Sequence, residues 1–337
     1  MVDEHTLTIA IPLYNKEHAI DSCLRSILAA GGGEPWIRIL IVDDGSSDSS
    51  RERALAWMDK FFHFRVISQG NKGLSETRNV LIDNAESDFI WFVDADDEIT
   101  KDSLNIIKND LEYASSQADL FLYGVFSKVG EQVTKYGIVD YVFTEQYGDN
   151  IAHINRTVTD IKECPELLLC YPSNCWCVFR KSLITDNNLR YPQGIWYEDL
   201  SMKLRLLAAA KNIFINIAPI YIYKNDLQSI MHTEDLSKNL DIIVALETMY
   251  AYCKKKGLTP EMMKYIEAAC ISQITLSTYQ RIWKINPQAQ ELKQITKWLN
   301  EKYPNWRRNR VIRRLPWKRR LLARLNGENI SFLNRFA

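Results

Sequence analysis

Residues 39–48 read ILIVDDGSSD, an apolar run that ends in two acids, a glycine and small polar residues. The apolar residues predict a buried strand over Arg38 to Val42. The segment Asp43 to Ser47 predicts a loop that leads into a helix N-terminus, because Asp, Gly and Ser are favoured there. This unit of strand, polar loop and helix decides the fold class, since it recurs in the sequence before and after residues 39–48.

The same unit is found before and after this stretch. Further strands are expected at Thr8–Pro12, Phe64–Ile67 and Phe89–Val93. Apolar residues at helical spacing predict helices between the strands, from Ile20, Leu24, Ile27 and Leu28, from Ala54, Leu55, Met58, Phe61 and Phe62, and over Leu74–Asn84. Alternation of this kind predicts an α/β fold with a mostly parallel sheet covered by helices on both faces.

The later part of the chain has a different pattern. Leu120–Val142 predicts antiparallel additions to the sheet, Trp176–Phe179 and Ile213–Tyr223 predict further strands, and a helix is expected from about Leu200 to Ala210. After Asp235 the pattern is helical, with helix starts at Thr259-Pro260 and Pro287. We therefore expect a sheet domain over 1–232, a helical accessory region over 233–305 and a basic amphipathic tail over 306–337.

Charge is balanced overall but unevenly distributed. The 42 basic and 42 acidic residues cancel, so no bulk field indicates nucleic acid, and none is expected as a partner. Between Trp306 and Arg324 there are nine Lys or Arg and no acid. The tail interleaves these cations with Trp and Leu, which is typical of segments that contact an anionic membrane surface, and Pro316 should divide it into two short helices. A solvated helix end is the alternative.

Cysteines and hydropathy bear on the cellular compartment. The seven cysteines form no CxxC pair, and Cys175 and Cys177 are typical of buried strand residues rather than zinc ligands. No basic region precedes the first apolar run, and no stretch of 18 apolar residues occurs. We expect a cytoplasmic protein, with peripheral contact at the inner face of the plasma membrane through residues 306–324.

Polar groups follow four predicted strands in order. They lie in PLYNKE (12–17), DDGS (43–46), GNKG (70–73) and DADD (94–97). Each could be an ordinary turn or helix cap by itself, but ligands of such sheets bind beyond the carboxyl ends of the strands. Several acids at one edge repel one another unless a cation offsets them, so we expect a divalent ion, Mn²⁺ or Mg²⁺, bound together with substrate phosphates.

Taken together, these segments resemble the family 2 glycosyltransferases of the GT-A fold. The resemblance covers about the first 225 residues and is carried by five ordered segments, IAIPLYN (9–15), ILIVDDGSSD (39–48), GNKGLSETRN (70–79), FVDADD (92–97) and WYEDLSMKLR (196–205). It implies an inverting, metal-dependent enzyme that moves a hexosyl group from a nucleotide diphosphate sugar, by default a UDP-sugar. The implied acceptor is a hydroxyl of a surface glycan or of a lipid-linked glycan precursor.

The resemblance also implies roles for individual residues of the donor site. Pro12, Tyr14 and Glu17 would line the uracil and ribose pocket, and Asp44 would bind the base or ribose. Lys72 would lie near the base and Arg78 near the diphosphate. Asp94 and Asp96 match the Asp-x-Asp pair. Asp96 would be the direct metal ligand, and Asp94 would lie nearer the donor sugar or ribose and also contribute to the metal site. His232 falls where a late ligand to metal or diphosphate can occur.

The same comparison marks Glu198 and Asp199 as the catalytic pair. In inverting enzymes one carboxylate deprotonates the acceptor hydroxyl as it attacks the anomeric carbon, and Asp199 is expected to be this base. The alternative is that Asp199 only caps the helix that follows. Trp196 and Tyr197 could stack on a sugar face or belong to the core.

Three rival functions agree less well with the sequence. A receiver domain would have the acid pair at its first strand and a lone Asp at its third, whereas here a strand precedes the pair and residues 94–97 form a cluster. A nucleotidyltransferase would have a Gly-rich loop after the first strand, where this chain has Pro12 to Glu17. An inactive binding protein is disfavoured because every expected acid is present.

Overall fold

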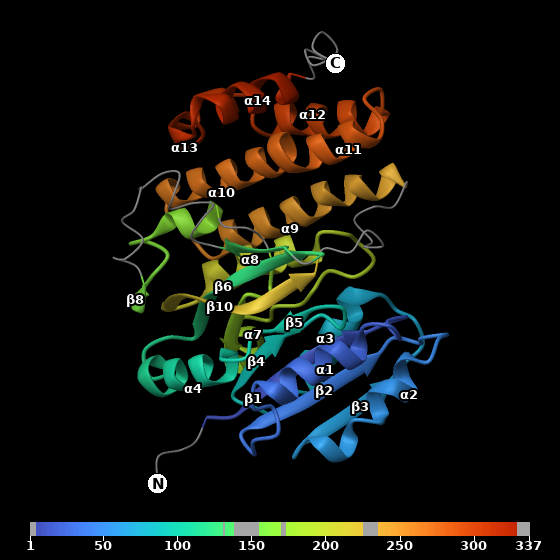
Figure 1. Ribbon diagram of the computed structural model, residues 1–337. Coiled ribbons are helices and arrows are strands. Elements are labelled where there is room, and N and C mark those ends of the chain that lie inside the picture. The colour runs from blue at the N-terminus through green and yellow to red at the C-terminus, as the bar shows by residue number, and fades with distance from the viewer. Residues whose placement is uncertain (1–4, 131, 138–154, 170–172, 225–234, 329–337) are drawn as a thin grey trace.

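The computed structural model describes residues 5–130, 132–137, 155–169, 173–224 and 235–328. A twisted sheet with helices on both faces forms one part of the molecule, and a stack of helices built from the C-terminal third lies beyond one side of it (Figure 1). Buried apolar side chains of the sheet and of the helical stack belong to one continuous core. The sheet and the helices therefore hold each other in place, while the domain boundaries drawn from the sequence remain predictions.

The first part of the chain alternates strands and helices, as predicted. Its elements are β1 (Leu7–Leu13), α1 (Ile20–Ala29), β2 (Ile37–Asp43), α2 (Ser50–Leu55), η1 (Met58–Lys60), β3 (Phe64–Ser68), α3 (Leu74–Asn84) and β4 (Phe89–Phe92). Strand β1 pairs in parallel with β2 and β4, and β2 pairs in parallel with β3. Buried apolar residues fill β1, β2 and β4, as expected of parallel strands covered on both faces, whereas β3 lies at the end of the sheet and is only partly buried.

The helix after β2 is shorter than the sequence pattern predicted. Helix α2 ends at Leu55 and a 3-10 turn follows, so Met58 and Phe62 are exposed, and their assignment to an apolar helix face was wrong. Only Phe61 turns inward, where its ring stacks on Phe64 at 5.5 Å between centroids. The indole Nε1 of Trp57 donates a hydrogen bond to Asp21 at 2.7 Å, which ties the turn after α2 to α1.

The second half of the sheet is mixed. Its elements are β5 (Glu98–Ile99), α4 (Ser103–Ala114), β6 (Leu120–Val129), β7 (Gln132–Gly137), β8 (Thr157–Thr159), η3 (Pro165–Leu169), β9 (Cys177–Arg180), α7 (Lys181–Thr185), α8 (Glu198–Ala209) and β10 (Ile213–Lys224). The strand order is β3-β2-β1-β4-β9-β6-β10-β5, with β7 beside β6 and β8 beside β10. Strand β9 runs antiparallel to both β4 and β6, and β6 runs parallel to β10. The antiparallel addition predicted over 120–142 is present as the β6–β7 hairpin, whereas residues from 138 lie outside the described part.

The C-terminal third is helical, as predicted. Its elements are η5 (Leu236–Leu240), α9 (Asp241–Lys255), α10 (Pro260–Ser272), the π-helix η6 (Gln273–Thr278), α11 (Tyr279–Ile285), α12 (Gln290–Lys302), η7 (Trp306–Arg308), α13 (Arg310–Arg314) and α14 (Trp317–Gly327). The hydroxyl of Thr259 caps α10 by accepting from the Met262 amide, with Pro260 at the first helical position. Helix α12 begins at Gln290, three residues after the expected start.

The basic tail is divided between core and surface. Pro316 separates α13 from α14, as predicted. Trp306, Val311 and Ile312 are buried against the helical stack. Trp317 and Leu321, by contrast, are 63% and 49% exposed and lie one helical turn apart on α14. Among the described residues, the helices are all too short or too polar to cross a membrane.

Candidate active site

The carboxyl ends of β1, β2 and β4 meet at one edge of the sheet because these strands are parallel and adjacent. The Asp44 amide donates to the carbonyl of Leu13 at 2.8 Å, which joins the loops after β2 and β1. The loop after β4 carries Asp94, Asp96 and Asp97 to the same edge. The acids that the sequence placed at successive strand ends are therefore brought together.

Asp44 organises the glycine-rich loop after β3. Its buried carboxylate accepts hydrogen bonds from the backbone amides of Lys72 at 2.9 Å and Gly73 at 2.8 Å, and from Gln69 Nε2 at 2.7 Å. These contacts fix the loop where it enters α3. Donor binding by Asp44 remains a prediction, while its observed hydrogen bonds show that the side chain fixes the conformation of the loop.

The remaining predicted donor residues differ in how far their side chains are open to solvent. Pro12 is a buried residue of β1, while Tyr14 and Lys72 are exposed. Glu17 is half-buried, and its Oε2 accepts from the Ser49 amide at 3.0 Å at the start of α2. The exposed phenol and ammonium groups are open to a ligand, whereas Pro12 and Glu17 are partly committed to the fold.

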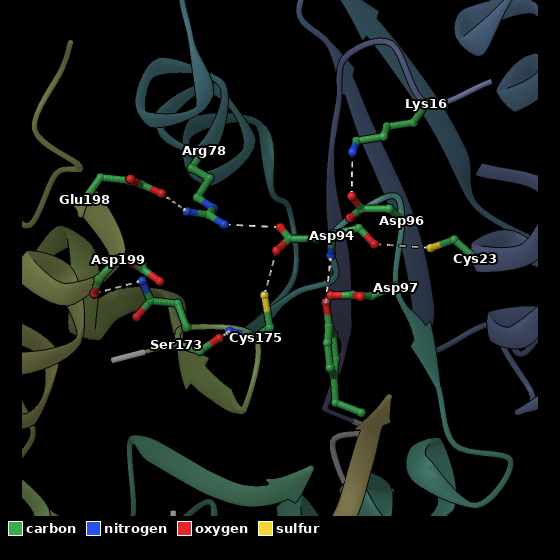
Figure 2. A network of polar contacts seen from close by, with 12 residues as sticks. Lys16, Cys23, Arg78, Asp94, Asp96, Asp97, Ser173, Cys175, Glu198 and Asp199 are labelled. Atoms are coloured by element: carbon green, nitrogen blue, oxygen red, sulfur yellow. Dashed lines mark hydrogen bonds and ion pairs between the residues drawn. The ribbon is translucent and has the colours of Figure 1, made fainter. Parts of the chain in front are cut away.

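Arg78 joins the two halves of the site. Its guanidinium donates to Asp94 Oδ1 at 3.1 Å and to Glu198 Oε1 at 2.6 Å, as Figure 2 shows. The side chain is only 4% exposed and lies against the rings of Phe92 and Tyr191. Burial lowers the pKa of Arg78, but Asp94 and Glu198 raise it well above its usual value. Arg78 therefore acts as a fixed cation between the Asp-x-Asp segment and the predicted catalytic carboxylates.

The second oxygen of Asp94 and the carboxylate of Asp97 also have side-chain partners. Cys175 Sγ lies 3.4 Å from Asp94 Oδ2 (Figure 2). The hydroxyl of Tyr221 donates to Asp97 Oδ2 at 2.6 Å. The Asp94 amide donates to the same Tyr221 hydroxyl at 3.2 Å. Burial, together with Asp94 and Asp96, raises the pKa of Asp97 well above its usual value. Asp97 is thus a structural support for the loop.

Asp96 is the open member of the cluster. Its side chain is 41% exposed, and Lys16 Nζ pairs with its Oδ2 at 2.5 Å. No group of three His, Cys, Asp or Glu in the described ranges could hold a metal by itself. Two neighbouring carboxylates fit Mg²⁺ or Mn²⁺ when substrate phosphates complete the coordination shell. The open carboxylate of Asp96, which pairs with the Lys16 ammonium, fits a metal brought with the donor, whereas Asp94 would join it only by giving up its contact with Arg78 or Cys175.

Glu198 and Asp199 begin helix α8. The preceding Tyr197 has a left-handed backbone with φ 66°, which a bulky residue adopts at a cost of about 1–3 kcal/mol. Asp199 Oδ1 accepts from the amide of Leu200 at 2.8 Å. Burial and the adjacent Glu198 raise the pKa of Asp199 to about 7, against an ordinary 3.8. A carboxylate with this pKa suits proton transfer near neutral pH.

Several residues of the site escaped the sequence analysis. Lys16, Cys175 and Tyr221 contact the acid cluster from segments far apart in the chain. Only Lys16 could have been found, since it lies within the polar PLYNKE segment. Tyr197 packs against the helical stack and is not free to stack on a sugar in this position. His232 lies outside the described residues.

Comparison with known proteins agrees with this geometry. Residues 8–186, just over half of the chain, match the profile of glycosyl transferase family 2. Glycosyltransferase GlyA of Streptococcus pneumoniae is 29% identical over 228 residues, which cover 66% of this chain and 31% of GlyA. Glycosyltransferase GlyG of the same organism is 27% identical over 264 residues, which cover 77% of this chain and 84% of GlyG. The chain thus spans less than a third of GlyA.

Solved structures show the same fold. The S. aureus TarS 1-349 complex with UDP-GlcNAc superposes with a TM-score of 0.72 at 18% identity, over 96% of this chain and 89% of that one. A mannosyltransferase from Pyrobaculum calidifontis, in complex with GDP-Man and Mn²⁺, superposes with a TM-score of 0.54 at 12% identity, over 99% and 88%. The matched residues 8–186 include the strand-end acids described above. This chain belongs to glycosyl transferase family 2 and has the GT-A fold.

Proposed function

We propose that this chain transfers a hexosyl group from a UDP-sugar to an acceptor hydroxyl with inversion at the anomeric carbon. The observation that carries the proposal is the bridge from Asp94 through Arg78 to Glu198, because it connects the donor-side acids to the segment that carries Asp199. A donor sugar bound over Asp94 would lie near a carboxylate of suitable pKa. The TarS complex contains UDP-GlcNAc, which supports a UDP-sugar.

In the proposed reaction, Asp199 accepts the proton of the acceptor hydroxyl. The hydroxyl oxygen then forms a bond to the anomeric carbon from the face opposite the diphosphate, and the bond from that carbon to the diphosphate oxygen breaks. UDP leaves with the electron pair. Asp96 and Asp94 would hold Mn²⁺ or Mg²⁺, which neutralises charge on the leaving diphosphate when bound. Lys16, which pairs with Asp96 in the absence of a metal, would then be free to contact the same phosphates.

On the donor side, the proposed ligands are the residues around the glycine-rich loop. Tyr14 and Lys72 offer an exposed ring and an exposed ammonium, and Asp44 holds the loop from beneath. Arg78 does not face outward, so we propose that it serves the donor site through Asp94. The proposed acceptor is a surface glycan or lipid-linked glycan precursor.

Calorimetry of UDP binding with and without Mn²⁺ tests the metal assignment. Wild-type protein should bind UDP more tightly with Mn²⁺, and Asp96→Ala should lose that gain. Asp102→Ala is the matched control, because Asp102 lies on the next helix start and outside the cluster. Unchanged Mn²⁺-dependent binding in Asp96→Ala would contradict the assignment.

A second proposal concerns the tail, where we infer peripheral contact with an anionic membrane at the cytoplasmic face. Trp317 and Leu321 are exposed on α14 among Lys318, Arg320 and Arg324, which gives an apolar strip flanked by cations. Since Trp306 and Val311 are buried, truncating the whole tail would damage the core, and point variants are the better test.

Vesicle flotation can distinguish membrane binding through α14 from a tail that is only exposed to solvent. Trp317→Ser with Leu321→Ser should release the protein from vesicles that contain phosphatidylglycerol, and added salt should weaken wild-type binding. Val244→Ser is the control, because Val244 is an exposed apolar residue of α9, 49% exposed and away from the tail. Binding that persists in the double variant would refute membrane contact through α14.

A further inference from the structure

The segment that carries Glu198 and Asp199 is attached to the helical stack through Tyr197. The Tyr197 hydroxyl donates to Asn239 Oδ1 at 2.8 Å and accepts from the guanidinium of Arg281 at 2.9 Å. The same guanidinium lies over the Tyr197 ring, 5.1 Å from its centroid. The phenol thus has both of its hydrogen-bonding functions engaged by residues more than 40 positions away in the sequence.

A second contact secures the same turn. The amide of Trp196 donates to Asp241 Oδ2 at 2.9 Å, at the first residue of α9. Helix α9 in turn packs along α8, and the two lie next to each other in Figure 1. Both residues before the acid pair are therefore bound to the helical stack, one by its backbone and the other by its side chain.

The acid pair is held from the opposite side by the sheet. Glu198 pairs with Arg78 of α3, which also binds Asp94. Tyr197, whose left-handed backbone turns the chain into α8, stands between these two attachments. Because the first helical residues follow this turn directly, a shift of the Tyr197 ring changes the direction in which Glu198 and Asp199 project.

We propose that Arg281 and Asn239 are positioning residues. Through Tyr197, the C-terminal helices would fix the carboxylates of Glu198 and Asp199 relative to the donor site. The proposal rests on the proposed function, since it assigns Asp199 as the base. It gives the helical stack a part in the reaction rather than in stability alone. Arg281 follows the π-helix η6 by only three residues, and π-helical turns are frequent at functional sites.

Arg281→Met tests the proposal, because it keeps the length of the side chain but removes the cation and the donor. We expect kcat for transfer to fall by about 10- to 100-fold, since a displacement of about 1 Å can cost that much. The Kd for UDP with Mn²⁺ should stay within about twofold, because donor contacts are made on the sheet. Arg281→Lys should recover a large part of kcat, as an ammonium can still donate to the phenol and lie over its ring.

Lys302→Met is the matched control. Lys302 pairs with Glu247 at 2.7 Å and lies 5.2 Å from the centroid of the Tyr250 ring, so it makes the same two kinds of contact within the helical stack, away from the acid pair. The control should lose a comparable amount of thermal stability and keep its kcat. If Arg281→Met retained wild-type kcat, or if its kcat fell no further than that of the control, the proposal would be overturned.

Two additional variants keep the outcomes distinct. Should Arg281→Met fail to fold, Tyr197→Phe removes only the hydroxyl, and a kcat equal to wild type in that variant would overturn the proposal. Asp199→Asn in the same assay reports on the proposed function separately. Loss of transfer in Asp199→Asn with normal transfer in Arg281→Met and Tyr197→Phe would refute the positioning role alone, whereas normal transfer in Asp199→Asn would refute the base assignment itself.

Discussion

Substituting Asp199 by Asn should abolish transfer and yet stabilise the protein at high pH. The raised pKa of about 7, against 3.8 for an ordinary Asp, means that the folded state holds the proton more tightly than the unfolded state. Stability therefore falls as pH rises from about 4 to about 7, and the full penalty is present above pH 7. The corresponding free energy is about 4 kcal/mol as an upper bound, since one pKa unit is about 1.4 kcal/mol.

Asn has the shape of the carboxylate without its charge, so the variant should escape this penalty. We expect Asp199→Asn to raise the free energy of unfolding by about 1–3 kcal/mol at pH 8, and by much less at pH 5, because relaxation and water entry reduce the ideal cost. Urea unfolding in the absence of metal and donor measures both values. Transfer by the same variant should drop at least ~100-fold, as expected when a general base is lost.

Glu198→Gln is the neighbouring control with the opposite sign. Its carboxylate accepts from the buried Arg78, so removing the charge should destabilise the protein by about 1–3 kcal/mol at both pH values. Two outcomes would refute the reasoning: a stabilisation of Asp199→Asn that is equal at pH 5 and pH 8, or a loss of stability in Asp199→Asn that matches the loss in Glu198→Gln.

Two further substitutions test the fold of the site. Arg78→Met leaves Asp94 and Glu198 without their shared cation and should cost about 3–5 kcal/mol in the free energy of unfolding, measured in urea; a cost below 1 kcal/mol would contradict the bridge. Gly45→Ala places a methyl group 2.9 Å from the Asn71 amide nitrogen, at a backbone φ of 74° that alanine rarely adopts. The substitution should therefore lower the free energy of unfolding by about 1–3 kcal/mol and weaken UDP binding. An unfolding free energy equal to that of wild type would contradict this close approach.

The fold was largely predictable because its signal is local. Each strand of the first half is a short apolar run, and each is followed by polar residues that begin a loop, so Val42 and Asp43 already mark the edge of the sheet. The helix after β2 was mispredicted because apolar residues continue past Leu55 at helical spacing, whereas the chain there forms a turn whose Trp57 bonds to Asp21, 36 positions away. Apolar spacing alone does not reveal such a contact.

The sequence placed the acids of the candidate site at the ends of strands and at a helix start, but it did not predict which side chains would contact them. Asp94, Asp96, Glu198 and Asp199 stand in recognisable segments, whereas the partner of each depends on how elements pack. Arg78 was expected near the diphosphate, which stays a prediction, but its pairing with Glu198, 120 positions away in the sequence, could not be predicted. The pairing of Lys16 with Asp96 and the contacts of Tyr197 with the helical stack likewise arise only when distant segments meet.

The central claim is metal-dependent transfer from a nucleotide sugar with Asp199 as the base. Release of nucleoside diphosphate from a panel of UDP-, GDP- and dTDP-sugars, measured with Mn²⁺ or Mg²⁺ and a mixture of glycan acceptors, tests it most directly. Wild-type protein should release UDP from at least one UDP-sugar only when metal is present, and Asp199→Asn should bind the same donor and release at least ~100-fold less. Equal release by the two proteins, or release by wild type that persists in EDTA, would contradict the account.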